Sequence, residues 1–298
     1  MTTSPSILES KIIAASDKLW KVTLFGPDNY KAATISHYLY SRDKKLKKYA
    51  INFSKDLLAD FYDEPLTNVL AEEALQYLIR FEEEYPFRKP PFPKFTFIDL
   101  FAGIGGFRLA LQNLQGNCVF SSEYDKYAQR TYYANFGEIP FGDITQEETK
   151  KWIPQTFDLL CGGFPCQPFS IAGVSKKNSL GRKHGFEDEK QGNLFFHIIE
   201  IIEKHRPKAF FLENVKNLTT HDKGNTFKII KQALMDLGYS FHTKILNGKH
   251  FVPQNRERTF MVGFDSKVFA YQEKFEFPVL PEPSQKISEI LEIGRAHV

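Results

Sequence analysis

Short apolar runs alternate with helical patterns along the chain from Phe95 onward. The first run, Phe95–Phe101, has the length and the bulky side chains of a buried strand, and the glycine-rich turn Gly103–Gly106 follows it at once. The spacing of an inward-facing helix comes next, at Phe107, Ala110, Leu111 and Leu114. Because strands that alternate with helices build open, largely parallel sheets, we expect an α/β fold.

The next two predicted strands end at acidic residues. Glu123 follows the second apolar run, and Asp143 follows a third candidate strand that ends near Phe141. Ligands of open α/β sheets bind at the carboxyl ends of the strands, and an acid about twenty residues after the glycine turn commonly holds a ribose hydroxyl. Tyr124 adds an aromatic face on which a purine can stack. The glycine turn and these two strand ends therefore predict a pocket for a nucleotide-like cofactor.

Cys166 lies in the stretch Gly162–Ser170, between two prolines and just past another predicted strand. A thiol on such a stiff loop is within reach of a substrate, and a thiolate is a strong soft nucleophile near neutral pH. The alternative is a buried structural cysteine, which is the expected state of Cys118 and Cys161 inside their apolar runs. Glu213 follows the fifth predicted strand and would place a carboxylic acid at the same edge of the sheet. A nearby acid favours the interpretation of Cys166 as a nucleophile over that of a structural cysteine.

The composition is that of a globular protein of 298 residues, with 42% apolar residues and a net charge of +3. This charge neither requires nor excludes a polyanionic partner. The three cysteines lack paired spacings, which predicts a reducing compartment without a disulfide framework or a metal site. The sequence contains no signal peptide and no run of transmembrane length, so we expect a cytoplasmic protein without a membrane partner. We also expect the protein to be a monomer.

The first 93 residues differ in composition from the rest of the chain. Helical spacing predicts a mostly helical segment over residues 1–85, and the prolines from Pro86 to Pro93 predict a stiff connector with a domain boundary after residue 93. The basic run Arg42–Lys48 is either a solvated helix face or a contact to phosphates. Residues 173–192 are polar and too long for a simple connection, so they are either functional or disordered.

Four motifs in a fixed order resemble those of the cytosine-5 DNA methyltransferases of bacterial restriction–modification systems. They are Phe-Ile-Asp-Leu-Phe-Ala-Gly-Ile-Gly-Gly from Phe97, Gly-Gly-Phe-Pro-Cys-Gln-Pro-Phe-Ser from Gly162, Glu-Asn-Val from Glu213 and Gln-Asn-Arg-Glu-Arg from Gln254. The resemblance covers residues 95–291. It implies a Rossmann-like sheet, mostly parallel with the last strand antiparallel, and transfer of a methyl group from S-adenosylmethionine to C5 of a cytosine flipped out of double-stranded DNA. It also implies a cognate restriction endonuclease as a partner and a location in the bacterial cytoplasm or nucleoid.

The resemblance assigns the cofactor pocket to residues around the first strand ends. Phe101 would stack on the adenine, and Gly103 and Gly105 would lie beside the methionine portion. Glu123 would hold the ribose hydroxyls, and Tyr124, where the family often has tryptophan, would cover the other adenine face. The remaining residues implied to contact the cofactor are Asp143, at the adenine amino group, and Ile144, Pro165 and Leu194.

The same resemblance assigns the chemistry to Cys166, whose thiolate would add to C6 of the cytosine and make C5 nucleophilic. Glu213 would contact N3 and N4 of the base, and Arg258, together with Arg256, would orient it. The residues implied to support the loop and the substrate are Gln167, Ser170, Asn214 and Gln254. The polar stretch 173–192 would close over the DNA and exclude water from the reaction.

Two other functions remain open from the sequence. The same motifs occur in a branch that methylates cytosine in tRNA, and the mild net charge does not separate the two substrates. The other alternative is a DNA-binding regulator that uses the N-terminal helices and keeps the methyltransferase fold as a passive platform. The intact Cys166 and Glu213 disfavour that alternative.

The end of the chain departs from the family pattern. In the family, a target-recognition domain and two further motifs follow the region where this chain stops, and nothing like them occurs after Ile290 or within residues 1–85. Residues 94–291 are therefore expected to be an incomplete catalytic domain, and Glu292–Val298 a non-native tail. Such a fragment is expected to be poorly soluble, to bind cofactor weakly and to methylate no DNA, and its target sequence cannot be inferred.

Overall fold

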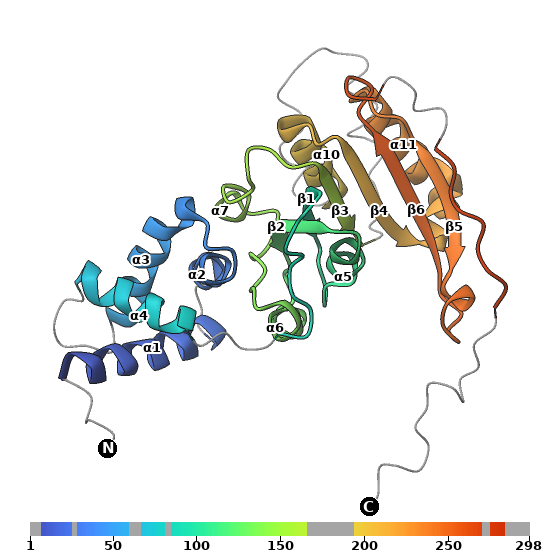
Figure 1. The fold of residues 1–298 in the computed structure, drawn as a ribbon. Helices are drawn as coiled ribbons and strands as arrows, with labels where there is room; N and C mark the ends of the chain where they lie inside the picture. The colour runs from blue at the N-terminus through green and yellow to red at the C-terminus, as the bar shows by residue number, and fades with distance from the viewer. Residues whose placement is uncertain are drawn as a thin grey trace, which may run out of the picture. The chain divides into compact units, whose positions relative to one another are not determined.

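The computed structural model describes residues 7–25, 29–59, 67–80, 85–165, 194–269 and 275–283. The chain divides into two compact units. The first unit contains residues 1–94 and 99–154, and the second contains residues 95–98 and 155–298. Figure 1 shows that the N-terminal part is built from helices and that the strands belong to the later part of the chain.

Four helices make up the N-terminal part of the first unit. Their bounds are α1 (Ile7–Phe25), α2 (Asn29–Ser41), α3 (Lys44–Leu58) and α4 (Asn68–Arg80). Asp43 begins α3 by accepting a hydrogen bond from the Lys45 backbone N–H at 2.9 Å. The helices bury a shared apolar core that includes Leu19, Ile35 and Leu75. The helical structure expected from the spacing of apolar residues is thus present in the described residues.

The chain continues with the first strand, a glycine turn and shorter elements, of which only residues 95–98 of the strand belong to the second unit. The elements from the first strand onward are β1 (Phe95–Leu100), α5 (Gly106–Asn113), β2 (Gly116–Ser122), α6 (Lys126–Phe136) and α7 (Glu147–Lys150). Helix α6 begins where the Asp125 side chain accepts a hydrogen bond from the Ala128 N–H at 2.7 Å. It ends at Gly137, whose φ of 75° lies in the left-handed region that glycine adopts without strain.

The strands form one six-stranded sheet in the order β2-β1-β3-β4-β6-β5. The later elements are β3 (Leu159–Gly163), α10 (Leu194–His205), β4 (Ala209–Val215), α11 (Asn225–Asp236), β5 (His242–Asn247) and β6 (Glu257–Phe264). Strands β3 and β4 pair in parallel, whereas β6 runs antiparallel to both β4 and β5. The expected α/β fold, with a mostly parallel sheet and an antiparallel last strand, is confirmed.

The strand expected near Phe141 is absent from the described residues, so that prediction was wrong. Phe141 makes only an isolated parallel bridge to Ser122, with two backbone hydrogen bonds of 2.8 Å beside it. Pro140 has no N–H to donate and Gly142 has no side chain to pack, so the pairing does not extend into a strand. Asp143 nevertheless follows a segment that is paired to the end of β2.

Helices α2 and α3 pack on the segment after β2 through aromatic rings. The Trp152 ring contacts Tyr49 and Phe53 of α3 with centroid separations of 5.1 and 5.9 Å, and it stacks on Phe141 at 5.8 Å. The His37 ring of α2 lies 4.9 Å from the same Phe141 ring. The N-terminal helices therefore belong to one compact unit with residues 99–154. The domain boundary after residue 93 stays a prediction.

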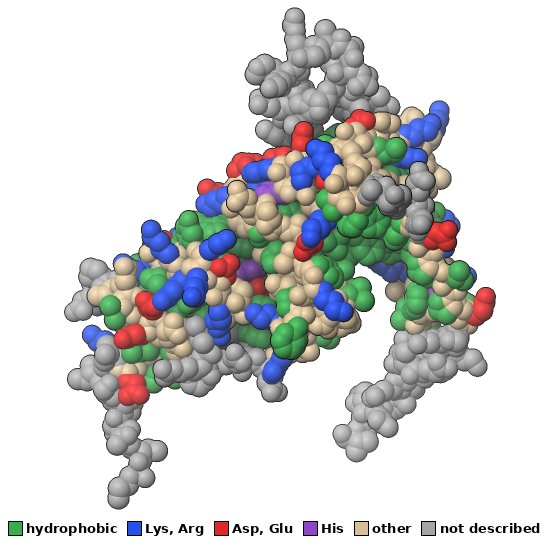
Figure 2. Space-filling view, turned by 45° about the horizontal axis from the view of Figure 1, so that its top comes forward, with side chains coloured by type: hydrophobic (Ala, Val, Ile, Leu, Met, Phe, Trp, Pro, Cys, Tyr) green, Lys and Arg blue, Asp and Glu red, His purple; other side chains and the backbone are tan. Residues whose placement is uncertain are grey.

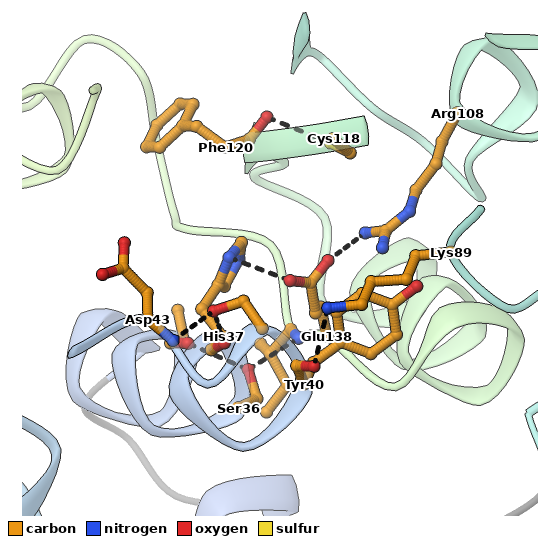
Figure 3. Close-up of polar contacts among 12 residues, drawn as sticks. Ser36, His37, Tyr40, Asp43, Lys89, Arg108, Cys118, Phe120 and Glu138 are labelled. Atoms are coloured by element: carbon orange, nitrogen blue, oxygen red, sulfur yellow. Dashed lines mark hydrogen bonds and ion pairs between the residues drawn. The ribbon is translucent and has the colours of Figure 1, made fainter. Parts of the chain in front are cut away.

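A buried ion cluster joins α2, α5 and the segment after α6 (Figure 3). The Glu138 side chain is 1% exposed, forms an ion pair with the buried Arg108 guanidinium and lies 3.2 Å from His37 Nδ1. Arg108 also donates hydrogen bonds to the Gln112 side chain at 2.6 Å and to the Tyr132 hydroxyl at 3.2 Å. Removing one partner from a buried ion pair costs about 3–5 kcal/mol, so this cluster is a major restraint on the unit.

Acidification below the ordinary pKa of histidine should destabilise the protein through His37. Burial lowers the pKa of His37 from 6.5, although the Glu138 carboxylate opposes the shift and Arg108 adds to it. Below pH 6.5 the unfolded chain therefore binds a proton that the folded chain does not. Each further pH unit costs about 1.4 kcal/mol of stability until the folded histidine is protonated too.

Urea unfolding of the wild type and of His37→Asn, at about pH 8 and about pH 5, measures this effect. Asparagine has no titrating group, so the wild type should lose more stability than the variant on acidification. Equal losses in the two proteins would contradict the assignment to His37.

The basic run that includes Lys47 lies on a surface of mixed charge. Lys47 of α3 forms an ion pair with Glu72 of α4, and Lys31 Nζ lies 3.6 Å from an Asp56 carboxylate oxygen. Figure 2 shows Lys and Arg side chains interspersed with Asp and Glu over the N-terminal helices. This pattern favours the solvated helix face over a dedicated contact to phosphates.

Candidate functional site

The expected site residues are divided between the two compact units. The first unit holds Phe101, Gly103, Gly105, Glu123, Tyr124, Asp143 and Ile144. The second unit holds Pro165, Leu194, Glu213, Asn214, Gln254, Arg256 and Arg258. Cys166, Gln167, Ser170 and the stretch 173–192 lie outside the described residues.

The Glu123 carboxylate connects the end of β2 to the glycine turn. Its Oε2 accepts a hydrogen bond from the Gly103 N–H at 2.7 Å, and its Oε1 accepts one from the Asp125 N–H at 2.8 Å. The Gln129 side-chain amide donates to the Glu123 carbonyl oxygen at 2.5 Å and fixes the backbone of the same residue. The structure thus brings Glu123 and Gly103 together, and it adds Gln129, which no sequence motif indicated.

The turn after β1 has three residues with left-handed backbone angles. The φ values are 55° at Phe101, 55° at Gly103 and 95° at Gly105. Glycine adopts this region freely, whereas a side chain costs about 1–2 kcal/mol there. Strained non-glycine residues are found at ligand sites, so the left-handed angle at Phe101 agrees with its assignment as a candidate binding residue, although five other described non-glycine residues also have a positive φ.

Alanine at Gly105 should damage this turn, whereas alanine at Gly106 should not. A Cβ at Gly105 would lie 2.1 Å from the Phe136 ring and would be held at a φ of 95°, whereas a Cβ at Gly106 would meet no atom within 4 Å. We expect Gly105→Ala to lower the free energy of unfolding by about 2–4 kcal/mol, and Gly106→Ala to change it by less than about 1 kcal/mol. Urea unfolding of the two variants measures both free energies. Similar decreases in the two variants would show that the close approach of Phe136 to Gly105 and the positive φ there do not limit stability.

The other candidates of the first unit differ in exposure. Tyr124 is 78% exposed and presents its ring to solvent beside Glu123. The Asp143 Oδ1 accepts a hydrogen bond from the Thr145 N–H at 2.9 Å, so this carboxylate also shapes its own turn. Ile144 is buried in the core. Tyr124 therefore offers accessible aromatic surface beside Glu123, whereas the Ile144 side chain packs in the core.

Glu213 and Arg258 lie on one face of the sheet at the end of β4. In the antiparallel register, Glu213 is opposite Phe260 and Val215 is opposite Arg258, which makes the two charged side chains diagonal neighbours. The distance from Glu213 Oε1 to Arg258 Nε is 2.8 Å, and the side chains are 20% and 23% exposed. The guanidinium therefore holds the carboxylate in one orientation while both groups remain partly open to solvent.

Arg256 lies farther from the same carboxylate. Its Nη2 is 4.0 Å from Glu213 Oε1, and its side chain is 54% exposed. The preceding turn is fixed because Asn247 Oδ1 accepts from the Arg256 N–H at 3.1 Å, and the Gln254 N–H donates to the Val252 carbonyl at 2.7 Å. Two guanidinium groups and one carboxylate together carry a net positive charge, which suits an anionic ligand such as a phosphate.

Asn214 points to the opposite face of β4, as successive residues of a strand do. Its buried side chain donates a hydrogen bond from Nδ2 to the Phe164 carbonyl oxygen at 2.9 Å. This bond fixes the chain just after β3, where the exposed Pro165 is the last described residue before Cys166. Leu194, half-buried, is the first residue of α10. Asn214 therefore holds the backbone of Phe164, two residues before Cys166 in the sequence.

Two of the three cysteines are buried thiols, as expected. Burial raises the pKa of Cys118 to about 12, although Arg108 opposes the shift, so its thiolate is scarce near neutral pH. The Cys161 thiol donates to the Ile98 carbonyl oxygen at 3.1 Å. Both positions are structural, which leaves Cys166 as the candidate nucleophile.

Within the described ranges, the structure contains no group of three or more His, Cys, Asp or Glu side chains that could hold a metal ion. No helix in the described part of the chain is both long enough and apolar enough to cross a membrane.

The comparisons with known proteins agree on one family. Residues 95–295 match the family model of the C-5 cytosine-specific DNA methylases. The chain is 52% identical over 246 residues to the type II methyltransferase M.HpaII of Haemophilus parainfluenzae, an alignment that covers 80% of this chain and 61% of the relative. It is 40% identical over 287 residues to M.MspI of Moraxella sp, with 95% and 64% coverage. It is 48% identical over 196 residues to M.HhaI of Haemophilus parahaemolyticus, with 65% and 56% coverage.

This chain spans about six tenths of the length of these curated relatives. The alignment with M.MspI is much longer than the segment after the proline-rich connector, so it includes N-terminal residues to which the motifs assigned no family. The family model covers more than half of this chain, and the alignment with M.HpaII shows 52% identity over 80% of this chain. The chain therefore belongs to the C-5 cytosine-specific DNA methylase family.

Proposed function

We propose that this chain is the catalytic part of a DNA (cytosine-5-)-methyltransferase, which transfers a methyl group from S-adenosylmethionine to C5 of cytosine. The observation that carries the proposal is the Glu213–Arg258 pair at the end of β4, next to the segment that Asn214 fixes ahead of Cys166. In a chain of this family, that arrangement would combine a positioned acid with a positioned nucleophile.

The residues around the glycine turn fit S-adenosylmethionine. The Glu123 carboxylate, oriented by the Gly103 N–H at 2.7 Å, keeps lone pairs with which to accept from ribose hydroxyls. A Cβ at Gly103 would meet no atom within 4 Å, so there is space for a ligand close to the backbone. Phe101 and Tyr124 would offer rings to the adenine. The proposed cofactor contacts are completed by Gly105, Asp143, Ile144, Pro165 and Leu194.

When bound, S-adenosylmethionine supplies the electrophilic methyl group. The Cys166 thiolate adds to C6 of the flipped cytosine, which forms a sulfur–carbon bond and moves an electron pair to C5. In its protonated form, the Glu213 carboxyl group, oriented by Arg258, would donate a hydrogen bond to N3 and so stabilise the negative charge that develops there. The methyl transfer to C5 would leave S-adenosylhomocysteine, after which loss of the C5 proton to solvent and expulsion of the Cys166 thiolate from C6 would restore the aromatic ring. A positioned acid of this kind contributes about 10²–10⁴ in rate.

Methyl transfer to DNA and to tRNA, followed by mass spectrometry of the nucleosides, tests the proposal. The assay uses the chain itself and a hybrid in which the part of M.HpaII beyond the aligned region follows it. Formation of 5-methyldeoxycytidine by either protein supports the proposal. Methylation of another atom, methylation of tRNA alone, or no transfer by a folded hybrid that binds S-adenosylhomocysteine would overturn it.

We further propose a role in restriction–modification. The relatives M.HpaII and M.MspI are named type II methyltransferases. A methyl group on C5 of cytosine projects into the major groove, where proteins distinguish base pairs, so methylation can block an endonuclease that binds the same bases. DNA methylated by an active form should resist one endonuclease that cuts the unmethylated DNA. Equal cleavage of both DNAs by every endonuclease tried would count against this role.

A further inference from the structure

We propose that helix α2 is a positioning element for the cofactor turn. In this proposal His37 of α2 fixes Glu138, Glu138 fixes Arg108 on α5, and these contacts hold the Gly103–Gly106 turn in its binding shape. The proposal rests on the proposed function, because it takes this turn to be the cofactor site. It gives the N-terminal helices a part in cofactor binding that no motif in them indicates.

Helix α2 holds residues 138–139 at two points. The Ser36 hydroxyl accepts a hydrogen bond from the Ile139 N–H at 2.9 Å, and His37 Nδ1 lies 3.2 Å from Glu138 Oε1. The Ser36 and His37 side chains are both buried. Because adjacent residues of one helix bind the backbone and the side chain of one short segment, that segment cannot shift without breaking both contacts.

Glu138 connects this segment to α5 (Figure 3). Its second carboxylate oxygen pairs with Arg108 Nη1, and Arg108 is the third residue of the helix that begins at Gly106. The guanidinium is fully buried, so it has no hydration to replace a lost partner. Its position, and with it the first turn of α5, therefore depends on where Glu138 is held.

The last turn of α6 connects the same segment to the glycine turn. Asn135 Nδ2 donates a hydrogen bond to the Ile104 carbonyl oxygen at 3.2 Å. The Phe136 ring occupies the space that a Cβ at Gly105 would need, and it lies 4.7 Å from the Arg108 guanidinium. The glycine turn thus rests on residues that immediately precede the segment held by α2.

A second contact of His37 leads to Glu123. The His37 ring packs on Phe141 at 4.9 Å, and the Phe141 carbonyl oxygen accepts from the Glu123 N–H at 2.8 Å. Glu123 in turn accepts from the Gly103 N–H. His37 therefore contacts Glu138, which pairs with Arg108 of α5, and also Phe141, which binds the backbone of Glu123.

Two substitutions of His37 separate this role from packing. His37→Asn keeps an N–H donor where Nδ1 lies, whereas His37→Leu fills a similar volume without a donor. Ser36→Ala, which removes the acceptor for Ile139, serves as a milder variant in case His37→Leu does not fold. The control is Leu75→Ala, because Leu75 lies in the core of the N-terminal helices, and its loss destabilises them without removing a contact to Glu138.

The first readout is amide hydrogen exchange of residues 102–108 in the ligand-free chain, and the second is the dissociation constant for S-adenosylhomocysteine. In His37→Leu we expect about tenfold faster exchange in this segment and about tenfold weaker binding, equivalent to about 1.4 kcal/mol. Ser36→Ala should change both quantities in the same direction by a smaller factor. His37→Asn should stay within about twofold of the wild type in both. Leu75→Ala should lower the Tm but leave exchange of residues 102–108 unchanged.

Unchanged exchange of residues 102–108 in the folded His37 and Ser36 variants would overturn the proposal. An equal effect of His37→Asn, or of Leu75→Ala, would also overturn it, because general destabilisation would then explain the result. If the wild type binds no S-adenosylhomocysteine, the proposed function fails. The exchange measurement would still decide separately whether α2 holds the turn.

Discussion

Cys166→Ala should abolish methyl transfer to cytosine while leaving the affinity for S-adenosylmethionine unchanged. Without a thiolate, no bond forms to C6 and C5 does not become nucleophilic, so the reaction loses its first step. The bond from Asn214 to the Phe164 carbonyl fixes the preceding chain and does not depend on the thiol, so the fold should survive the substitution. Methyl transfer and calorimetry on the same preparation, in an active form of the protein, separate the two quantities.

A DNA duplex with 5-fluorocytosine at the target should trap the wild type covalently. Fluorine at C5 cannot leave as a proton does, so the thiolate is not expelled after methylation. Peptide mapping should place the adduct at Cys166, and Cys161→Ala serves as the matched control that still forms it. An adduct at Cys118 or Cys161 would refute the assignment, since both are buried thiols in the folded chain.

Glu213→Ala should reduce the rate constant of methyl transfer by about 10²–10⁴. The carboxyl group is proposed to stabilise the charge at N3 of the cytosine, and alanine leaves nothing in its place. Arg258→Ala should give a smaller loss of the same kind, because Arg258 orients this carboxylate at 2.8 Å. Single-turnover kinetics measures the chemical step in each variant without interference from product release.

The double variant tests whether the two residues act together. If Arg258 acts through Glu213, the double variant should lose less activation free energy than the sum of the losses in the two single variants. We expect this difference, the coupling energy, to be about 0.5–3 kcal/mol. The neighbouring ion pair between Lys216, the residue that follows β4, and Glu257 of β6, at 2.7 Å, provides a matched control. Lys216→Ala should leave the rate unchanged. Full additivity of the Glu213 and Arg258 variants would show that the pair has no joint role.

Apolar runs located most of the strands because a strand buried on both faces needs a continuous apolar sequence. The periodicity of α5 predicted a helix but not its buried face. Leu114, expected to face inward, is 65% exposed, whereas Arg108 and Gln112 are buried. Hydropathy ranks arginine as a surface residue, and its burial is compensated by the ion pair with Glu138 and by the hydrogen bonds to Gln112 and Tyr132, which the helical pattern does not indicate.

The motifs likewise located candidate site residues without their contacts. Nothing local in the sequence indicates that Arg258 meets Glu213, because the meeting depends on the antiparallel register of β4 and β6. His37 and Gln129 carried no signal at all, since a single histidine or glutamine in a helix is common on any surface. The expected roles of Cys166 and of the cofactor residues stay predictions.

The two buried thiols have a practical consequence for studying how the chain opens. Cys118 lies on β2 in the first compact unit, and Cys161 lies on β3 in the second. An alkylating reagent reaches a buried sulfur only while the surrounding structure is transiently open, so the alkylation rate of each thiol measures the opening free energy of its own unit. The native sequence thus carries one such probe in each unit. Their relative rates would show whether the two units open together or one before the other.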